Sequence, residues 1–404
     1  MINLSLNKKI IIFGFIFTFF SSFGQSFFLG LFNAPIRSEL GITHGQFGSI
    51  YAAATIFSSL LFIWAGKKID DFRLLNYSFF VIILLFFSTL FFSFISSIYF
   101  LAVGIFLMRF SGQGLMGHIS STAISRYFEK RRGKALSVSW LGLSAAEFIL
   151  PVLVIYFLTF FSWRSVWQGI SIMIILILPL IINYTIKNIN FESRESDSKL
   201  ILKTKIKSWK RIEVLKDYRF YIISSNMLAM PWIFTGMAVY QSFISDSKLW
   251  ESYTIPKAFM VYSIASIITL FLSGFLVDKF TSRKLIPIMN IPLLFAMIVL
   301  FYSKHEISAY FFLGLIGVSN GFGNILGSST WAEIYGVKYI GGIKALTTAF
   351  MVFSTALGTA LFGILIDNGF TIENIAFICG SYIVVSISIL MLFRKTLEPV
   401  KLEN

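Results

Sequence analysis

Long apolar segments alternate with short polar breaks along almost the whole chain. Apolar runs between charged, glycine or proline breaks predict twelve segments long enough to cross a bilayer, which takes roughly 20 helical residues. The predicted spans are 10–34, 45–66, 74–95, 98–122, 134–160, 164–186, 218–244, 256–277, 285–303, 307–331, 343–366 and 371–393. The pattern predicts an all-α integral membrane protein with twelve transmembrane helices.

The one long polar stretch, 187–217, separates six predicted spans from six. We therefore expect an N-terminal six-helix bundle at 1–186, a cytoplasmic linker at 187–217 and a C-terminal six-helix bundle at 218–404. Three landmarks repeat at nearly one offset, which indicates that the two bundles are pseudo-symmetric copies of one unit. They are Asp70 and Asp278 at 208 residues, Gly112-x-Gly114 and Gly321-x-Gly323 at 209, and Lys134-Ala135-Leu136 and Lys344-Ala345-Leu346 at 210.

Composition agrees with a membrane protein, because 56% of residues are hydrophobic and only 13% are charged, against about 25% charged in soluble proteins. A net charge of +15 could suggest nucleic-acid binding, so the placement of the charges decides. Of the 34 lysines and arginines, 28 fall on the side of the predicted termini and linker, and five fall on the other side. By the positive-inside rule the N- and C-termini are cytoplasmic, in the cell (inner) membrane, and no nucleic-acid partner is expected.

Several functional classes lack the residues they need. Three scattered histidines and the absence of HExxH and GxxxxGK[ST] argue against an enzyme and against ATP-driven transport. The single cysteine, Cys379, lies in an apolar run, so we expect no disulfide, metal or cofactor site. Parallel repeats of six helices are one of the architectures of secondary transporters.

Two charges lie deep in the fourth and fifth predicted spans. If the two helices enter the membrane near Phe100 and Ala135, Arg109 lies about 14 Å deep and Glu147 about 18 Å deep, so both fall near the bilayer midplane. A lone charge at that depth costs on the order of 3 kcal/mol even on a lenient scale. We therefore expect Arg109 and Glu147 to be in contact. Arg109 is either a ligand for a substrate carboxylate or a structural partner of Glu147, and Glu147 is the candidate proton carrier.

The loop after the eighth span reads Gly274-Phe275-Leu276-Val277-Asp278-Lys279-Phe280-Thr281-Ser282-Arg283-Lys284. It resembles the G-x-L-a-D-R-x-G-R-[RK] loop of the major facilitator superfamily. The loop after the second span keeps Gly66 and Asp70 but departs at Lys68, Asp71 and Arg73. The segments Phe23-Gly24-Gln25, Arg126-Tyr127-Phe128 with Arg131-Arg132-Gly133, and Trp331-Ala332-Glu333-Ile334-Tyr335-Gly336 resemble the monocarboxylate-transporter-like branch of that superfamily.

The resemblance implies that the first, fourth, seventh and tenth spans line a central cavity. The polar residues of those spans are the candidate substrate and coupling residues, although interhelical hydrogen bonding is the alternative for each. They are Gln25, Asn33, Arg109, Gln113, Asn226, Tyr240, Gln241, Asn320, Asn324 and Ser328, with Glu147 from the fifth span. The candidate gating residues of the two loops are Gly66, Asp70, Arg73, Gly274, Asp278, Arg283, Lys284 and Glu333.

These residues predict a monomeric secondary active transporter in the lipid bilayer. Its expected substrate is a small organic anion such as a monocarboxylate, moved by alternating access with a proton or another coupling ion. Proton-driven efflux of amphipathic or cationic compounds is the alternative function.

Overall fold

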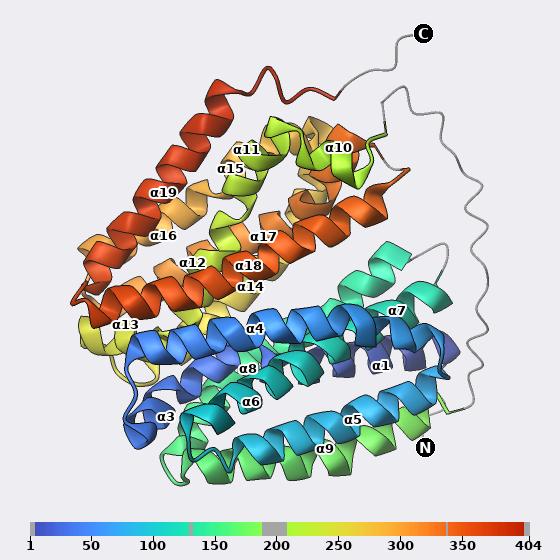
Figure 1. The fold of residues 1–404 in the computed structure, drawn as a ribbon, viewed down its shortest axis with the longest axis vertical. Helices are drawn as coiled ribbons and strands as arrows, with labels where there is room; N and C mark the ends of the chain where they lie inside the picture. Colours follow the sequence, from blue (N-terminus) through green and yellow to red (C-terminus); the bar gives the residue numbers. More distant parts are fainter. Residues whose placement is uncertain (1–4, 129–131, 188–207, 337, 400–404) are drawn as a thin grey trace. The chain divides into compact units, whose positions relative to one another are not determined.

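The computed structural model of the protein describes residues 5–128, 132–187, 208–336 and 338–399 (Figure 1). Within those ranges every regular element is a helix, and twelve helices are long and apolar enough to cross a membrane. The prediction of an all-α fold with twelve spans is confirmed.

The helices before residue 187 form the first six spans. They are α1 (Leu6–Ser21), η1 (Ser22–Gly24), α2 (Ser26–Leu29), η2 (Gly30–Phe32), α3 (Asn33–Leu40), α4 (His44–Lys67), η3 (Lys68–Asp70), α5 (Leu74–Phe92), α6 (Ile98–Met108), η4 (Arg109–Met116), α7 (Gly117–Tyr127), α8 (Arg132–Leu158) and α9 (Trp163–Thr185). The spans themselves run over Leu6–Gly24, His44–Asp70, Leu74–Phe92, Ile98–Tyr127, Gly133–Leu158 and Trp163–Thr185.

The helices after residue 208 form the other six spans. They are α10 (Arg211–Leu215), α11 (Tyr218–Met227), α12 (Ala229–Val239), α13 (Gln241–Lys248), α14 (Thr254–Phe280), α15 (Ser282–Met289), α16 (Ile291–Tyr302), α17 (Ile307–Tyr335), α18 (Ile340–Asp367) and α19 (Ile372–Leu392). Their spans run over Tyr218–Val239, Thr254–Phe280, Ser282–Tyr302, Ile307–Tyr335, Ile340–Asp367 and Ile372–Leu392.

The chain forms two compact units. The first comprises Met1–Glu195 with Ala238–Ser242, and the second comprises Ser196–Met237 with Phe243–Asn404. The segment Ala238–Ser242, which we expected inside the C-terminal bundle, therefore packs with the first unit. Most of the predicted linker lies outside the described residues; its last part forms the short helix α10.

Two spans end earlier than the apolar pattern indicated. The first was expected to run unbroken over 10–34, but it ends at Gly24 and continues as short helical pieces to Leu40. The seventh was expected to reach 244 and ends at Val239. Hydropathy does not detect such breaks, because the residues on both sides remain apolar.

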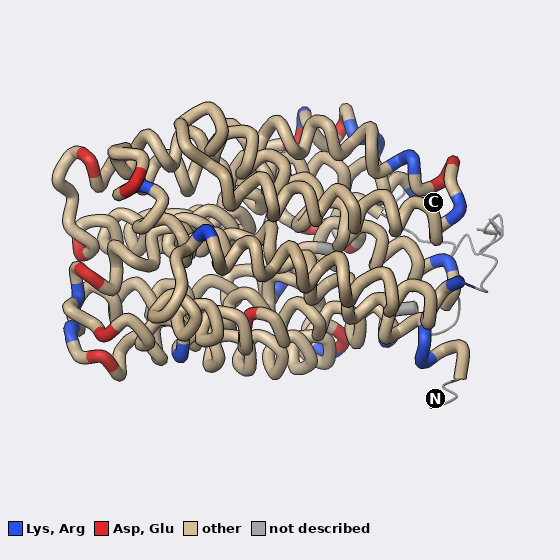
Figure 2. The backbone as a smooth tube through the Cα atoms, turned by 90° about the horizontal axis from the view of Figure 1, so that it is seen from below, with Lys and Arg blue, Asp and Glu red and all other residues tan. Residues whose placement is uncertain are grey.

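Charged residues gather at the helix ends, and the middle of the spans is almost free of them (Figure 2). At one end of the first unit, Arg164 donates to Glu39 Oε1 at 2.5 Å and to the backbone oxygens of Ser93 and Ile95 at 2.8 and 2.6 Å. The hydrogen bond from Arg164 lowers the pKa of the Glu39 carboxyl. This cluster ties together the ends of three spans.

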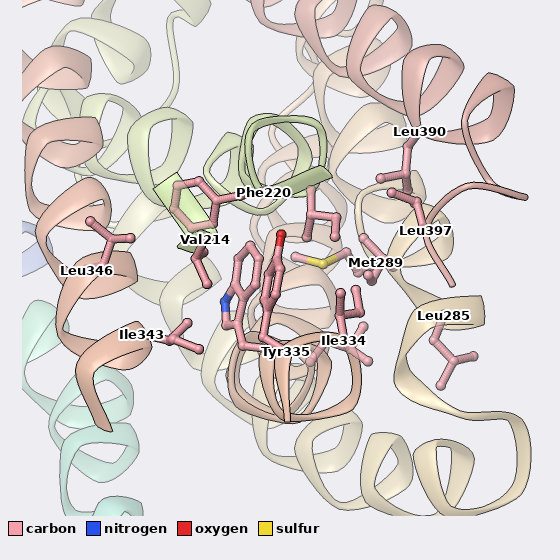
Figure 3. Close-up of a cluster of buried hydrophobic side chains, with 14 residues drawn as sticks. Val214, Phe220, Leu285, Met289, Ile334, Tyr335, Ile343, Leu346, Leu390 and Leu397 are labelled. Carbon is pink, nitrogen blue, oxygen red and sulfur yellow. The ribbon is translucent and has the colours of Figure 1, made fainter. Parts of the chain in front are cut away.

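A cluster of buried side chains closes one end of the second unit (Figure 3). Val214 of α10, Phe220 of α11 and Tyr335 of α17 meet there with Leu397, which follows the last helix. The backbone N–H of Trp209 donates to the Tyr335 carbonyl at 3.0 Å. The end of the linker and the segment after α19 are thus packed onto the same helical bundle.

A buried ion pair lies beside this cluster. Arg219 Nη2 is 2.7 Å from Asp217 Oδ2, and the two side chains are 8% and 5% exposed. Arg219 also donates to the Glu398 carbonyl at 2.7 Å and lies over the rings of Trp209 and Tyr335. One guanidinium therefore connects the linker, the seventh and tenth spans and the C-terminal segment.

We expect Arg219→Ala to destabilise the second unit by about 3–5 kcal/mol, because it leaves Asp217 buried without its cation. Thermal unfolding in detergent, followed by size-exclusion chromatography, measures this effect. Lys216→Ala is the matched control, since Lys216 is exposed and surface changes cost about 0.5 kcal/mol or less. Equal stability of the two variants would contradict a role for the pair.

Candidate functional site

The first span is broken near its middle. Helix α1 passes into η1 at Ser22–Gly24, and Gln25 then adopts an extended conformation with φ −83° and ψ 153° before α2 begins. A break of this kind leaves backbone N–H and C=O groups without intrahelical partners. In membrane transporters, irregular backbone occurs where it is buried in protein or lines a cavity.

The fourth span is irregular at the same place. Its residues Arg109–Met116 form a π-helix between α6 and α7. Such π-helical turns are rare in proteins, and those that occur are often found at functional sites. The two irregular segments touch through glycines: a Cβ added to Gly24 would lie 2.3 Å from the Met108 oxygen and 2.4 Å from the Gln113 nitrogen. A Cβ on Gly112 would lie 2.7 Å from the Gly24 nitrogen. Only glycine permits this backbone contact.

Arg109 reaches from the π-helix to the break. Its Nη1 donates to the Gly24 carbonyl at 3.2 Å and to Ser26 Oγ at 3.4 Å, and its guanidinium lies 5.3 Å from the centre of the Tyr51 ring. Tyr51 in turn donates to Ser26 Oγ at 3.1 Å. The Arg109 side chain is 3% exposed, yet its buried Nε has no hydrogen-bond partner. The site therefore holds a buried cation with a donor to spare.

The expected contact between Arg109 and Glu147 is wrong. Among the described residues no ion pair or hydrogen bond joins them, and the Glu147 carboxylate, 7% exposed, has no partner of either kind. The reason is direction, since Arg109 points to the first and second spans while Glu147 lies on α8.

Glu147 nevertheless lies near the level of the break. Helices α1 and α8 pack together where Thr18 Oγ1 donates to the Ser139 carbonyl at 2.6 Å and Gly14 approaches Ser139 Oγ. Eight residues further along α8, Glu147 is roughly 12 Å from this contact, beside the end of the first span. Arg109 and Glu147 thus both flank the break without touching.

The remaining candidates of the first unit divide into two groups. Gln25 and Gln113 lie in the break and the π-helix and are partly buried. Asn33, Tyr240 and Gln241 form a separate set of hydrogen bonds. Asn33 donates to the Val239 carbonyl at 3.0 Å, Tyr240 to the His44 carbonyl at 2.9 Å and Gln241 to the Phe27 carbonyl at 2.9 Å. These bonds attach the segment Ala238–Ser242 to the continuation of the first span and to the start of α4.

The second unit contains a cavity of about 350 Å³ between α11, α12, α17 and α18. Asn320 and Asn324, two of the candidate substrate residues of the tenth span, line it, and Asn320 also donates to Ser266 Oγ at 2.9 Å. The side chain of Ser328 lies outside the described residues. Asn226 does not line the cavity: it is fully buried and donates to Ser386 Oγ at 3.4 Å, so its bonds are between helices.

Sequence reasoning missed several residues of these sites. Ser26 and Tyr51 give no signal in sequence, because their role depends on the break. Lys344, Thr347 and Thr348 line the cavity of the second unit, whereas in the sequence Lys344 served only as a landmark of the repeat and as one of the basic residues at a span end. Within the described ranges, no three His, Cys, Asp or Glu side chains gather closely enough to hold a metal ion.

A family model for the major facilitator superfamily matches residues 14–256. The chain belongs to the major facilitator superfamily. Two solved structures of this kind are similar to it over nearly their whole length. The nucleoside transporter NupG has a TM-score of 0.72 at 16% identity, with 97% of this chain and 100% of that chain covered. An inward-facing bacterial homologue of the human lysosomal transporter Spinster has a TM-score of 0.66 at 14% identity, with 97% and 96% covered.

No protein with a curated description matches the chain. Superfamily membership makes the protein a membrane transporter, and the similar structures support the fold. The resemblance to the monocarboxylate-transporter-like branch stays a prediction.

Each of the two candidate gating loops is bonded to the end of a neighbouring span, the fourth span in the first unit and the tenth span in the second. In the first unit, Asp70 pairs with Arg126 at the end of the fourth span, and the Gly66 carbonyl lies 2.9 Å from His118 Nε2. In the second unit, Glu333 of the tenth span accepts from Ser282 Oγ at 2.5 Å and lies 3.5 Å from Arg283 Nε. The other predicted gating residues of these loops, Arg73, Asp278 and Lys284, are exposed, and Gly274 has open space around it.

We expect Gly24→Ala to abolish transport and to destabilise the protein by about 1–3 kcal/mol, because the added methyl group collides with backbone that cannot yield easily. Gly169→Ala in the sixth span is the control, since a Cβ there meets nothing within 4 Å. Transport in proteoliposomes and thermal unfolding, measured on both variants, test the contact. Normal transport by Gly24→Ala would show that the close approach is dispensable.

Proposed function

We propose that this transporter is a monomeric secondary active transporter of a small organic anion, such as a monocarboxylate, which it moves by alternating access with proton coupling. The observation that carries the proposal is the buried guanidinium of Arg109, which has no carboxylate partner among the described residues and keeps its Nε donor free. The site is the break of the first span together with the π-helix of the fourth.

No carboxylate among the described residues compensates the positive charge of Arg109. A guanidinium inside a membrane protein is costly unless a counter-charge or hydrogen bonds satisfy it. Here neutral groups bind one side of it: the Gly24 carbonyl, the Ser26 hydroxyl and the face of Tyr51. A planar fork with remaining donors is suited to a carboxylate. A bound organic anion would supply the missing negative charge.

Glu147 is the proposed proton carrier. It is buried and has no hydrogen-bond or ion-pair partner among the residues that the structure describes, and an ionised carboxylate without a partner is strongly disfavoured away from water. It lies near the level of the same break, so a change in its charge would alter the electrostatic potential around a substrate bound there. Proton uptake and anion binding would then favour one another.

The distribution of basic residues supports an orientation with both termini in the cytoplasm, in the inner membrane of the cell. Cationic compounds, amphipathic cations among them, fit the described residues less well, because Arg109 and Lys344 would repel their positive charge. A neutral nucleoside, the kind of substrate that the name of the nucleoside transporter NupG indicates for that protein, serves as a comparison solute.

Uptake into proteoliposomes, with labelled carboxylates and an imposed pH gradient, tests the proposal. We expect Glu147→Gln to lose gradient-driven uptake but to keep exchange of internal for external substrate. We expect Arg109→Gln to weaken substrate affinity at least about tenfold, since hydrogen bonds to charged groups contribute about 1.5–3 kcal/mol.

Glu251→Gln and Arg211→Gln are the matched controls, because both side chains are exposed. Normal affinity in Arg109→Gln would make the arginine structural and would favour the efflux function. Uptake by the wild-type protein at a rate that does not change with the pH gradient would contradict the role of Glu147.

A further inference from the structure

The cavity of the second unit is lined by apolar and by polar side chains. The apolar ones include four methionines, Met227, Met230, Met289 and Met351, together with Trp331 and Phe350. The polar ones are Asn320 and Asn324 from α17 and Lys344, Thr347 and Thr348 from α18. Its volume of about 350 Å³ lies near the lower end of the range for small-molecule sites.

Lys344 is exposed and is the only charged side chain among the residues that line this cavity. Its ammonium group makes no hydrogen bond or ion pair with the residues that the structure describes, and no Asp or Glu is among the residues that line the cavity. It is the fifth residue of α18, near the end at which the helix dipole disfavours a cation. Neither an ion pair with a described residue nor the helix dipole therefore stabilises this exposed charge.

The polar groups beside Lys344 complete a set of donors. Asn320, Asn324, Thr347 and Thr348 all line the same cavity, and they come from two neighbouring helices. Thr347 donates its hydroxyl proton to the Lys344 carbonyl at 3.0 Å and Asn320 donates to Ser266 Oγ, so the Asn324 amide and the Thr348 hydroxyl are the donors that stand beside Lys344. A cation, amide donors and hydroxyl donors without a carboxylate form the complement of an anionic group.

We propose that this cavity is a subsite for an amphipathic organic anion, in which Lys344 pairs with the carboxylate and the methionine side chains contact the carbon chain. The inference rests on the proposed function and names the substrate class more closely: a carboxylate that bears a compact apolar group. Methionine side chains are flexible and polarisable, so they would accept chains of several lengths and shapes.

Lys344 has an ordinary alternative role, as one of the positive charges that orient the spans in the membrane. Lys338 separates the two roles. It is exposed, it precedes the same helix by two residues and it lies over the Tyr339 ring. It does not line the cavity. If Lys344 served only to orient the spans, replacing it would affect ligand binding no more than replacing Lys338 does.

Isothermal titration calorimetry on the purified full-length protein at pH 7 tests the subsite, with aliphatic carboxylates of increasing length, their neutral amides, inorganic phosphate and a neutral nucleoside as probes. We expect wild-type affinity for the carboxylates to rise with chain length. We expect Lys344→Gln to weaken carboxylate binding about 10- to 100-fold and to leave binding of the neutral amides unchanged. Lys344→Arg should retain most of the affinity, and Lys338→Gln should bind as the wild type does.

Several outcomes would overturn the proposal. They are equal carboxylate affinity in Lys344→Gln and Lys338→Gln, equal losses for amides and carboxylates, and tighter binding of phosphate or nucleoside than of any carboxylate. Thermal unfolding of each variant verifies that it is folded. Carboxylate binding that depends on Lys344, without uptake driven by a pH gradient, would contradict proton coupling in the proposed function and leave the subsite in place.

Discussion

The hydrogen bond from Arg109 to the Gly24 carbonyl holds together the two irregular segments of the first unit. A broken helix and a π-helix each leave backbone groups unsatisfied, and inside a bilayer water does not replace the lost bonds. The guanidinium satisfies one of these groups, and the glycine contact between Gly24 and Gly112 brings the segments close enough for it to do so. Burial of the cation and breakage of the helix are therefore mutually dependent.

Close approach through small residues recurs in both units. A Cβ on Gly142 of α8 would lie 2.0 Å from the Phe15 carbonyl of α1, and one on Gly317 of α17 would lie 2.3 Å from the Tyr262 carbonyl of α14. Lipid tails are as apolar as leucine, so helices in a membrane associate through tight packing and hydrogen bonds rather than through the hydrophobic effect. The glycines that dilute the apolar spans are the contact points of this packing.

The two units have the same ion pair between a loop and a span end, but the acidic and basic partners are exchanged. Each fastens the loop between its second and third spans to the end of its fourth span by an ion pair. In the first unit the loop supplies the acid, Asp70, and the span supplies Arg126; in the second the loop supplies Arg283 and the span supplies Glu333. The candidate sites differ likewise, since the first unit has a broken helix with one buried arginine and the second a cavity with an exposed lysine.

Span number, the repeat and the superfamily could be derived from the chain directly, because length, hydropathy and loop motifs are local properties. Arg109 and Glu147 were recognisable for the same reason, as rare charges within apolar runs. Which groups these charges meet depends on the rotation and breakage of helices, and hydropathy does not record either. Arg109 points to Gly24, Ser26 and Tyr51 instead of Glu147 because the first span breaks beside it. Lys344 belongs to a cavity because α17 packs beside α18 there. Contacts between distant helices, and not any property of the residues alone, determined these two sites.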